Sequence, residues 1–225
     1  MIAPVAGWQR ARQPEQVALR REAILVAARE ILAERAVNDI SLRELSDRVG
    51  LAKSNVLRYF ESREAIFLEI LDEQWKQWLA VVTERLAALP RPGNRRPFAR
   101  HEKVAATLAR TLSEQRLLCD LIGVMSSVLE RNITVGFARD FRGRASANTA
   151  QLAQSLHTAI PILGEPGSLH VAGATFFLVA GLWPYANPVD ALADGADPAL
   201  LLNTFTVNLA EGLTNILVGV AVRAG

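Results

Sequence analysis

Apolar residues recur at helical spacing along almost the whole chain. The first such segment, residues 15–36, has one apolar helical face made of Ile24, Ala27, Ala28, Ile31 and Leu32. The same spacing predicts helices at residues 53–60, 62–89, 98–113, 115–131, 134–160, 168–186 and 198–222. No run of β-branched residues alternates with polar ones, as strands would require. The pattern therefore predicts an all-α protein.

Two short helices are predicted to meet at a glycine. In "NDISLRELSDRVG", Ser41 and Glu44 have the spacing of a capping box that begins a helix, and Gly50 ends that helix. Only "GLA" separates it from the next helix, residues 53–60. Two short helices joined by a tight glycine turn form a helix-turn-helix motif.

A long helix follows this motif without a gap. Ser62 is placed to cap it, and its inner stripe includes Trp75 and Trp78. The proline- and glycine-rich segment "LPRPGNRRP", residues 89–97, ends it. The long helix thus leads from the motif into the apolar remainder of the chain.

Positive charge is concentrated in the N-terminal half, although the net charge is only +2. Every Lys and Arg except Arg223 lies at or before Arg144. A polyanion would therefore meet the N-terminal half. The C-terminal half is suited to burial, and we expect a dimer surface on two of its helices. Its members are the small residues Ala172, Gly173, Ala174, Ala180 and Gly181 and the stripe Phe205, Leu209, Leu213, Leu217 and Val220.

Enzymatic chemistry has little support in the sequence. His101, His157 and His170 show no metal-ligand spacing with one another or with Cys119. No glycine-rich phosphate loop, nucleophile elbow or paired-carboxylate motif is present. We therefore expect no enzyme activity, no cofactor and no metal. Cys119 lies in an apolar helical run, which favours a packed core thiol.

A cytoplasmic location is expected. A single cysteine fits a reducing compartment, and the N-terminus lacks the apolar segment of a signal peptide. The uncharged stretch 166–189 has a continuous apolar core, Val171 to Trp183, of 13 residues. A membrane span needs about 18 to 20 residues, so a buried helix is the favoured interpretation and no membrane partner is expected.

Residues 18–71 resemble the DNA-binding module of the tetracycline-repressor (TetR) family. The resemblance lies in ordered features: a helix ending in "AER", then "ISLRELSDRVGLAKSNVLRYF", then "ESREAIF". The positions that match the family pattern are Gly50, Lys53, Tyr59, Phe60, Ser62 and Glu64. The chain departs from it at Ala52, where the family usually has serine, and at Leu57, where it usually has a phosphate-binding tyrosine. "LCDLIGVMSSVLERNIT" and "LVAGLWPYANP" also look like one C-terminal subgroup of the family.

The resemblance implies a domain of residues 15–61 that binds double-stranded DNA and a domain of residues 62–225 that binds a ligand and dimerises. The second helix of a helix-turn-helix enters the major groove with its first residues at base edges. The expected DNA contacts are Arg43, Lys53, Ser54, Asn55, Arg58, Tyr59 and Arg63. Lys53, Tyr59 and Arg63 are assigned to phosphates, and Arg43 and Asn55 to bases. The arm residues Arg10 and Arg12 could add contacts.

The family likeness further implies a homodimer on a palindromic operator, joined through a four-helix bundle, and a small-molecule effector. The candidate walls of an effector pocket are Trp78, Phe98, His101, Met125, Phe137, Phe177 and Trp183. We expect a mostly apolar effector that releases the operator, which would make the protein a repressor. The alternative is a helical protein-interaction module without sequence-specific DNA binding, since Ala52 and Leu57 weaken the recognition helix.

Overall fold

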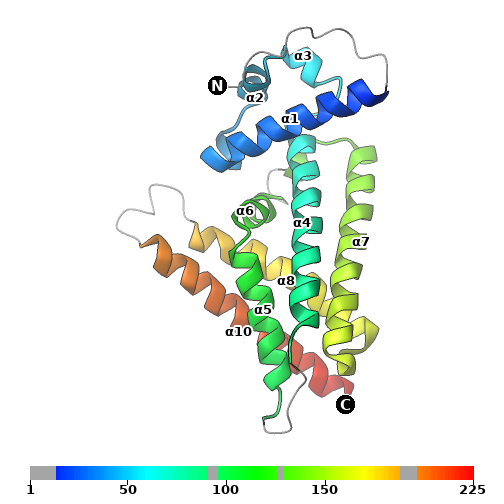
Figure 1. Cartoon of the computed structure of the whole chain (residues 1–225), viewed down its shortest axis with the longest axis vertical. Coiled ribbons are helices and arrows are strands. Elements are labelled where there is room, and N and C mark those ends of the chain that lie inside the picture. Colours follow the sequence, from blue (N-terminus) through cyan, green and yellow to red (C-terminus); the bar gives the residue numbers. More distant parts are fainter. Residues whose placement is uncertain (1–13, 91–95, 126–128, 188–196) are drawn as a thin grey trace. The chain divides into compact units, whose positions relative to one another are not determined.

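The computed structural model describes residues 14–90, 96–125, 129–187 and 197–225, and these residues form helices without any strand (Figure 1). This confirms the predicted all-α fold. The chain divides into two compact units, one of residues up to Ile70 with Met125–Arg139, the other of Leu71–Val124 with Asp140–Gly225. Arg10 and Arg12 lie outside the described residues. The functional division into residues 15–61 and 62–225 stays a prediction.

The first unit is a small helical cluster around one apolar core. Its elements are α1 (Pro14–Glu34), the 3-10 turn η1 (Val37–Asp39), α2 (Leu42–Val49), α3 (Lys53–Val56), the start of α4 (Arg63–Ala87), the 3-10 turn η2 (Leu129–Arg131) and the start of α7 (Val135–Ala159). The predicted apolar faces meet in the core: Ile24, Ile31, Leu45 and Val56 are fully buried, and Phe60 nearly so.

Helix α3 is shorter than the predicted helix 53–60. Beyond Val56 the chain tightens, because the N–H of Arg58 donates to the Asn55 carbonyl at 3.2 Å and that of Tyr59 to the Val56 carbonyl at 2.9 Å. These bonds span three residues, as in a 3-10 turn. The turn brings Phe60 into the core, and Ser62 then caps α4 by accepting from the Ala65 N–H at 3.1 Å.

The second unit packs the rest of α4 and α7 with four further helices: α5 (Ala99–Ser113), α6 (Arg116–Val124), α8 (Gly164–Ala186) and α10 (Pro198–Ala224), with the 3-10 turn η3 (Pro161–Leu163) before α8. Helix α10 packs on α5 and α8, and α6 packs on α8. The predicted helix 115–131 is therefore wrong in extent, since α6 ends at Val124 and residues 129–131 form a 3-10 turn in the first unit.

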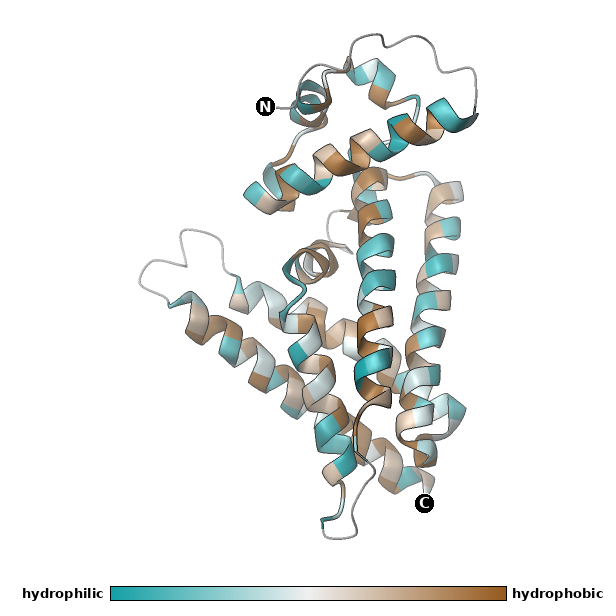
Figure 2. Ribbon diagram, viewed as in Figure 1, coloured by the Kyte–Doolittle hydropathy of each residue, from teal (hydrophilic) through white to brown (hydrophobic). Residues whose placement is uncertain are grey.

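The leucine stripe of α10 faces its own chain. Leu209, Leu213 and Leu217 are fully buried because α10 lies against both α5 and α8. This stripe is therefore not free to form the predicted dimer surface. The outer faces of α8 and α10 are less covered. By length and composition alone, the segments Pro161–Ala186 and Pro198–Ala224 could cross a membrane. Only 28% and 33% of the residues in their most apolar windows are buried in this structure. Figure 2 shows few hydrophilic positions along α8 and α10.

Candidate nucleic-acid interface and ligand pocket

The turn between α2 and α3 is fixed by local bonds. Ser41 Oγ accepts from the Glu44 N–H at 3.1 Å, which confirms the predicted N-cap of α2. Gly50 has φ +73°, and its N–H donates to the Asp47 carbonyl at 3.2 Å. Only glycine adopts this left-handed conformation without strain. With Leu45 and Val56 fully buried, the two short helices are held in one arrangement.

The outer surface of α2 and α3 is cationic and polar. Lys53, Ser54, Asn55 and Arg58 are all exposed. Within the described ranges, neither Lys53 nor Arg58 forms an ion pair, whereas most other cations of this unit do. Arg43 reaches solvent with 89% of its side chain exposed and lies 3.9 Å from Asp47. These side chains are free to contact phosphates and base edges.

Tyr59 is half-buried and held by helix α1. Its hydroxyl accepts from Arg20 Nη1 at 3.0 Å, so the hydroxyl proton can still be donated outward. Arg21 donates to the Tyr59 carbonyl and to Glu69 Oε1 at 2.7 Å, and its guanidinium lies 4.1 Å from the centre of the Phe60 ring. Sequence reasoning missed Arg20 and Arg21, because adjacent arginines in a helix give no signal of a long-range partner.

Arg63 is turned inward rather than toward the outer surface. Its guanidinium donates to the Ile40 carbonyl and to Glu64 Oε1 at 2.8 Å, and only 18% of the side chain is exposed. Glu64 is itself buried, and Asn132 Nδ2 donates to the same oxygen at 3.3 Å. This geometry ties Arg63 to the first unit, and its predicted phosphate contact stays a prediction.

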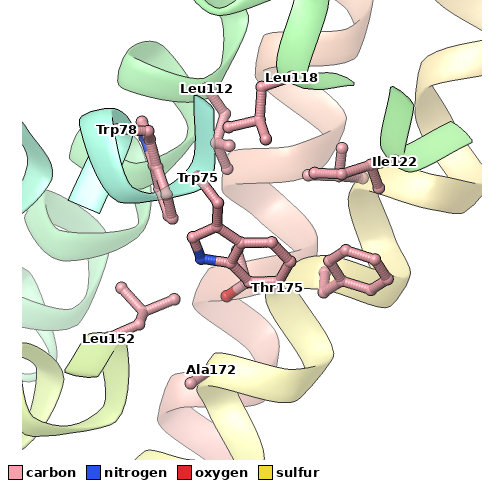
Figure 3. Close-up of a pocket in the computed structure, with 10 residues that line it drawn as sticks. Trp75, Trp78, Leu112, Leu118, Ile122, Leu152, Ala172 and Thr175 are labelled. Atoms are coloured by element: carbon pink, nitrogen blue, oxygen red, sulfur yellow. The ribbon is translucent and has the colours of Figure 1, made fainter. Parts of the chain in front are cut away.

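The second unit contains a small apolar pocket (Figure 3). Its lining residues come from α4, α5, α6, α7 and α8: Trp75, Trp78, Leu112, Leu118, Ile122, Leu152, Ala172, Thr175, Phe176 and Val179. Its volume is about 10 Å³, which is about one water molecule. Phe176 stacks on Trp75 with ring centres 4.9 Å apart and so fills most of the space.

Among the predicted pocket residues, only Trp78 lines this pocket. Met125 and Phe137 belong to the first unit, and Phe177 points away, with 75% exposure. Trp183 is buried against Phe205 and donates its indole N–H to Asp120 Oδ1 at 2.7 Å. These residues do not line the pocket because helical spacing identifies the inner face of a helix but not the cavity that this face borders.

His101 borders a different, more open cavity of about 280 Å³ with Phe98 at the start of α5. Burial lowers the pKa of His101, which favours the neutral ring. Burial raises the pKa of Asp120, against the hydrogen bonds from Trp183 and Asn187. Cys119 is fully buried, as predicted, and burial raises the pKa of its thiol, so it is unreactive.

Comparison with known proteins gives two family matches that cover most of the chain. The profile of "Bacterial regulatory proteins, tetR family" matches residues 24–70, and that of "Tetracyclin repressor-like, C-terminal domain" matches residues 72–224. The HTH-type transcriptional regulator RutR of Escherichia coli K12 is 29% identical over 69 residues, which is 31% of this chain and about a third (32%) of RutR. The HTH-type transcriptional repressor AcnR of Corynebacterium diphtheriae is 27% identical over 139 residues, 56% of this chain and 71% of AcnR.

Solved structures show the same fold at low identity. The fatty acid degradation regulator FadR of Bacillus halodurans superposes with a TM-score of 0.51 at 11% identity, covering 85% of this chain and 94% of FadR. FadR of Bacillus subtilis, solved in complex with stearoyl-CoA, gives 0.52 at 16% identity, covering 85% of this chain and 98% of that one. At these identities the likeness concerns the fold alone.

Proposed function

The chain belongs to the TetR family of DNA-binding transcriptional regulators, and from this premise we propose that it is a cytoplasmic repressor that binds a palindromic operator as a homodimer and is released by a small apolar effector. The observation that carries the DNA-binding part is the exposed polar and cationic surface of α2 and α3, on which Lys53 forms no ion pair with a described residue. Lys53 supplies a phosphate contact, and Asn55 and Arg43 are the proposed base contacts.

The outer face of α8 supports the homodimer. Phe177 is 75% exposed on this face, and Leu169 and Tyr185, eight residues before and after it, are exposed by 51% and 81% toward its two edges. Gly173 and Gly181 lie four residues before and after Phe177, on the same face. A Cβ added at either glycine would meet no atom of the described residues within 4 Å, apart from the nearby backbone of its own helix. Exposed apolar side chains thus alternate with glycines whose surroundings are unoccupied. Such a surface suits close packing against the α8 helix of a second copy.

Two covalent routes connect the pocket to the DNA-binding surface. Helix α4 carries Trp75 and Trp78 and begins directly after the recognition segment. Helix α6 also lines the pocket and leads into a segment of the first unit, where the Thr134 N–H and Oγ1 donate to the Glu61 carboxylate at 2.7 and 2.8 Å. An effector that enlarges the pocket would displace these helices and so change the separation of the two recognition helices, which a palindrome accepts only near about 34 to 36 Å.

We predict that Lys53→Ala weakens binding about equally across DNA sequences. The loss of one phosphate contact lowers the dependence of log affinity on log salt by about 0.9 per contact, or about 1.8 for the two copies in a dimer. Gel shifts with the DNA upstream of the protein's own gene, titrated with salt, measure this. The control is Lys76→Ala, which removes a lysine paired with Asp72 in the second unit. No shift with any DNA would leave the interaction module as the function.

A further inference from the structure

Trp75 has a buried hydrogen-bond donor with no acceptor among the described residues. The side chain is only 6% exposed, and no described residue accepts a hydrogen bond from its Nε1. Trp78, one helical turn later, lines the same pocket and donates its indole N–H to Thr111 Oγ1 at 3.1 Å. Buried polar groups nearly always have a partner, and each exception calls for an explanation. Figure 3 shows the Trp75 indole crossing the middle of the lining side chains.

A water molecule is a poor partner for this N–H. A buried water makes about three hydrogen bonds. The other pocket side chains are apolar except Trp78 and Thr175, whose polar hydrogens are already donated to Thr111 and to the Val171 carbonyl. A ligand that brings one acceptor atom and otherwise apolar surface matches this lining better.

The lining also excludes a charged ligand. None of the residues that form the pocket is acidic or basic, and an ion placed there would lose its hydration without gaining a counter-ion. We propose that the effector is a neutral, mainly apolar ring compound with one hydrogen-bond acceptor, and that Trp75 Nε1 donates to that acceptor. The proposal rests on the effector pocket of the proposed function.

Phe176 covers the face of the Trp75 indole and restricts access to the pocket. It stacks on the Trp75 indole with planes 15° apart, it is half-buried, and its other edge meets the exposed Phe177. Rotation of Phe176 toward the surface opens the pocket and uncovers the face of the indole. A flat ligand then enters beside the indole and places its acceptor in the plane of that ring, in line with the N–H.

The experiment compares naphthalene with quinoline, which has the same shape and one ring nitrogen as acceptor. Both are titrated calorimetrically into the full chain carrying Phe176→Ala, without DNA. We expect quinoline to bind about tenfold more tightly, the effect of one buried hydrogen bond. In Phe176→Ala with Trp75→Phe the two probes should bind equally. The matched control, Phe176→Ala with Trp78→Phe, should keep the tenfold preference, because Trp78 donates to Thr111.

A second measurement keeps the proposal testable if the opened variant does not fold. In the otherwise native chain both Trp75→Phe and Trp78→Phe remove the same buried volume, but only Trp78→Phe also breaks a hydrogen bond. Trp75→Phe should therefore lower the melting temperature less than Trp78→Phe does. In the titration, the proposal is overturned if neither probe binds to the folded Phe176→Ala chain, if both probes bind equally there, or if the preference for quinoline survives Trp75→Phe. In the melting experiment, it is overturned if Trp75→Phe lowers the melting temperature as much as Trp78→Phe does. A failed gel shift with an intact probe preference would count against the regulator, not against this site.

Discussion

Arg63→Ala is expected to lower the free energy of unfolding by about 3 kcal/mol, the cost of removing one partner of a buried ion pair. Glu64 is 6% exposed and would be left with Asn132 as its remaining side-chain donor. The Ile40 carbonyl would lose its Arg63 donor as well. Urea unfolding followed by circular dichroism measures the change in midpoint.

The matched control is Arg58→Ala, which removes an equally charged but exposed side chain and should change stability by less than about 0.5 kcal/mol. Arg63→Ala combined with Glu64→Gln removes the stranded charge and should recover part of the loss. If Arg63→Ala leaves the unfolding midpoint unchanged but flattens the salt dependence of DNA binding, Arg63 contacts phosphate after all, as the family resemblance implies.

The sequence predicts most of the helices and the helix-turn-helix well, because both depend on local chemistry. Ser41 and Ser62 cap the starts of α2 and α4, and Gly50 ends α2 in a left-handed conformation, as predicted. The exposure of Lys53, Ser54 and Asn55 follows from a helix whose only buried residue is Val56. Such features need no knowledge of distant parts of the chain.

What the sequence does not predict depends on long-range packing. Arg63 is an expected phosphate contact, yet its guanidinium is directed to the Ile40 carbonyl, 23 residues away. Phe177 and Phe176 are neighbours, and the sequence alone does not tell which one stacks on Trp75 and which one is exposed. The leucines of α10 are apolar enough for a dimer surface, but α5 and α8 already cover them.

The largest expected effect comes from Phe177→Asp, which should convert the dimer into monomers. Phe177 is 75% exposed, so the change costs the single chain little, while two carboxylates would be buried near the centre of the proposed α8 interface. A monomer has one recognition helix, so its affinity for the operator should fall to that of non-specific DNA binding. Non-specific binding is at least roughly 10³-fold weaker than specific binding. Sedimentation and gel shifts measure the two losses. Leu19→Asp, 71% exposed on α1, is the sedimentation control and should remain dimeric.

Two glycines separate an interface effect from a folding effect. At Gly181 an added Cβ meets no described residue within 4 Å outside its own helix turn, and a helix tolerates leucine better than glycine. Gly181→Leu should therefore leave the monomer folded and still block the close approach of a second α8. At Gly167 a Cβ would lie 2.6 Å from Val220 Cγ1, so Gly167→Ala should instead lower the stability of the chain itself. A Gly181→Leu protein that stays dimeric at micromolar concentration and binds operator normally would show that the dimer forms through another surface.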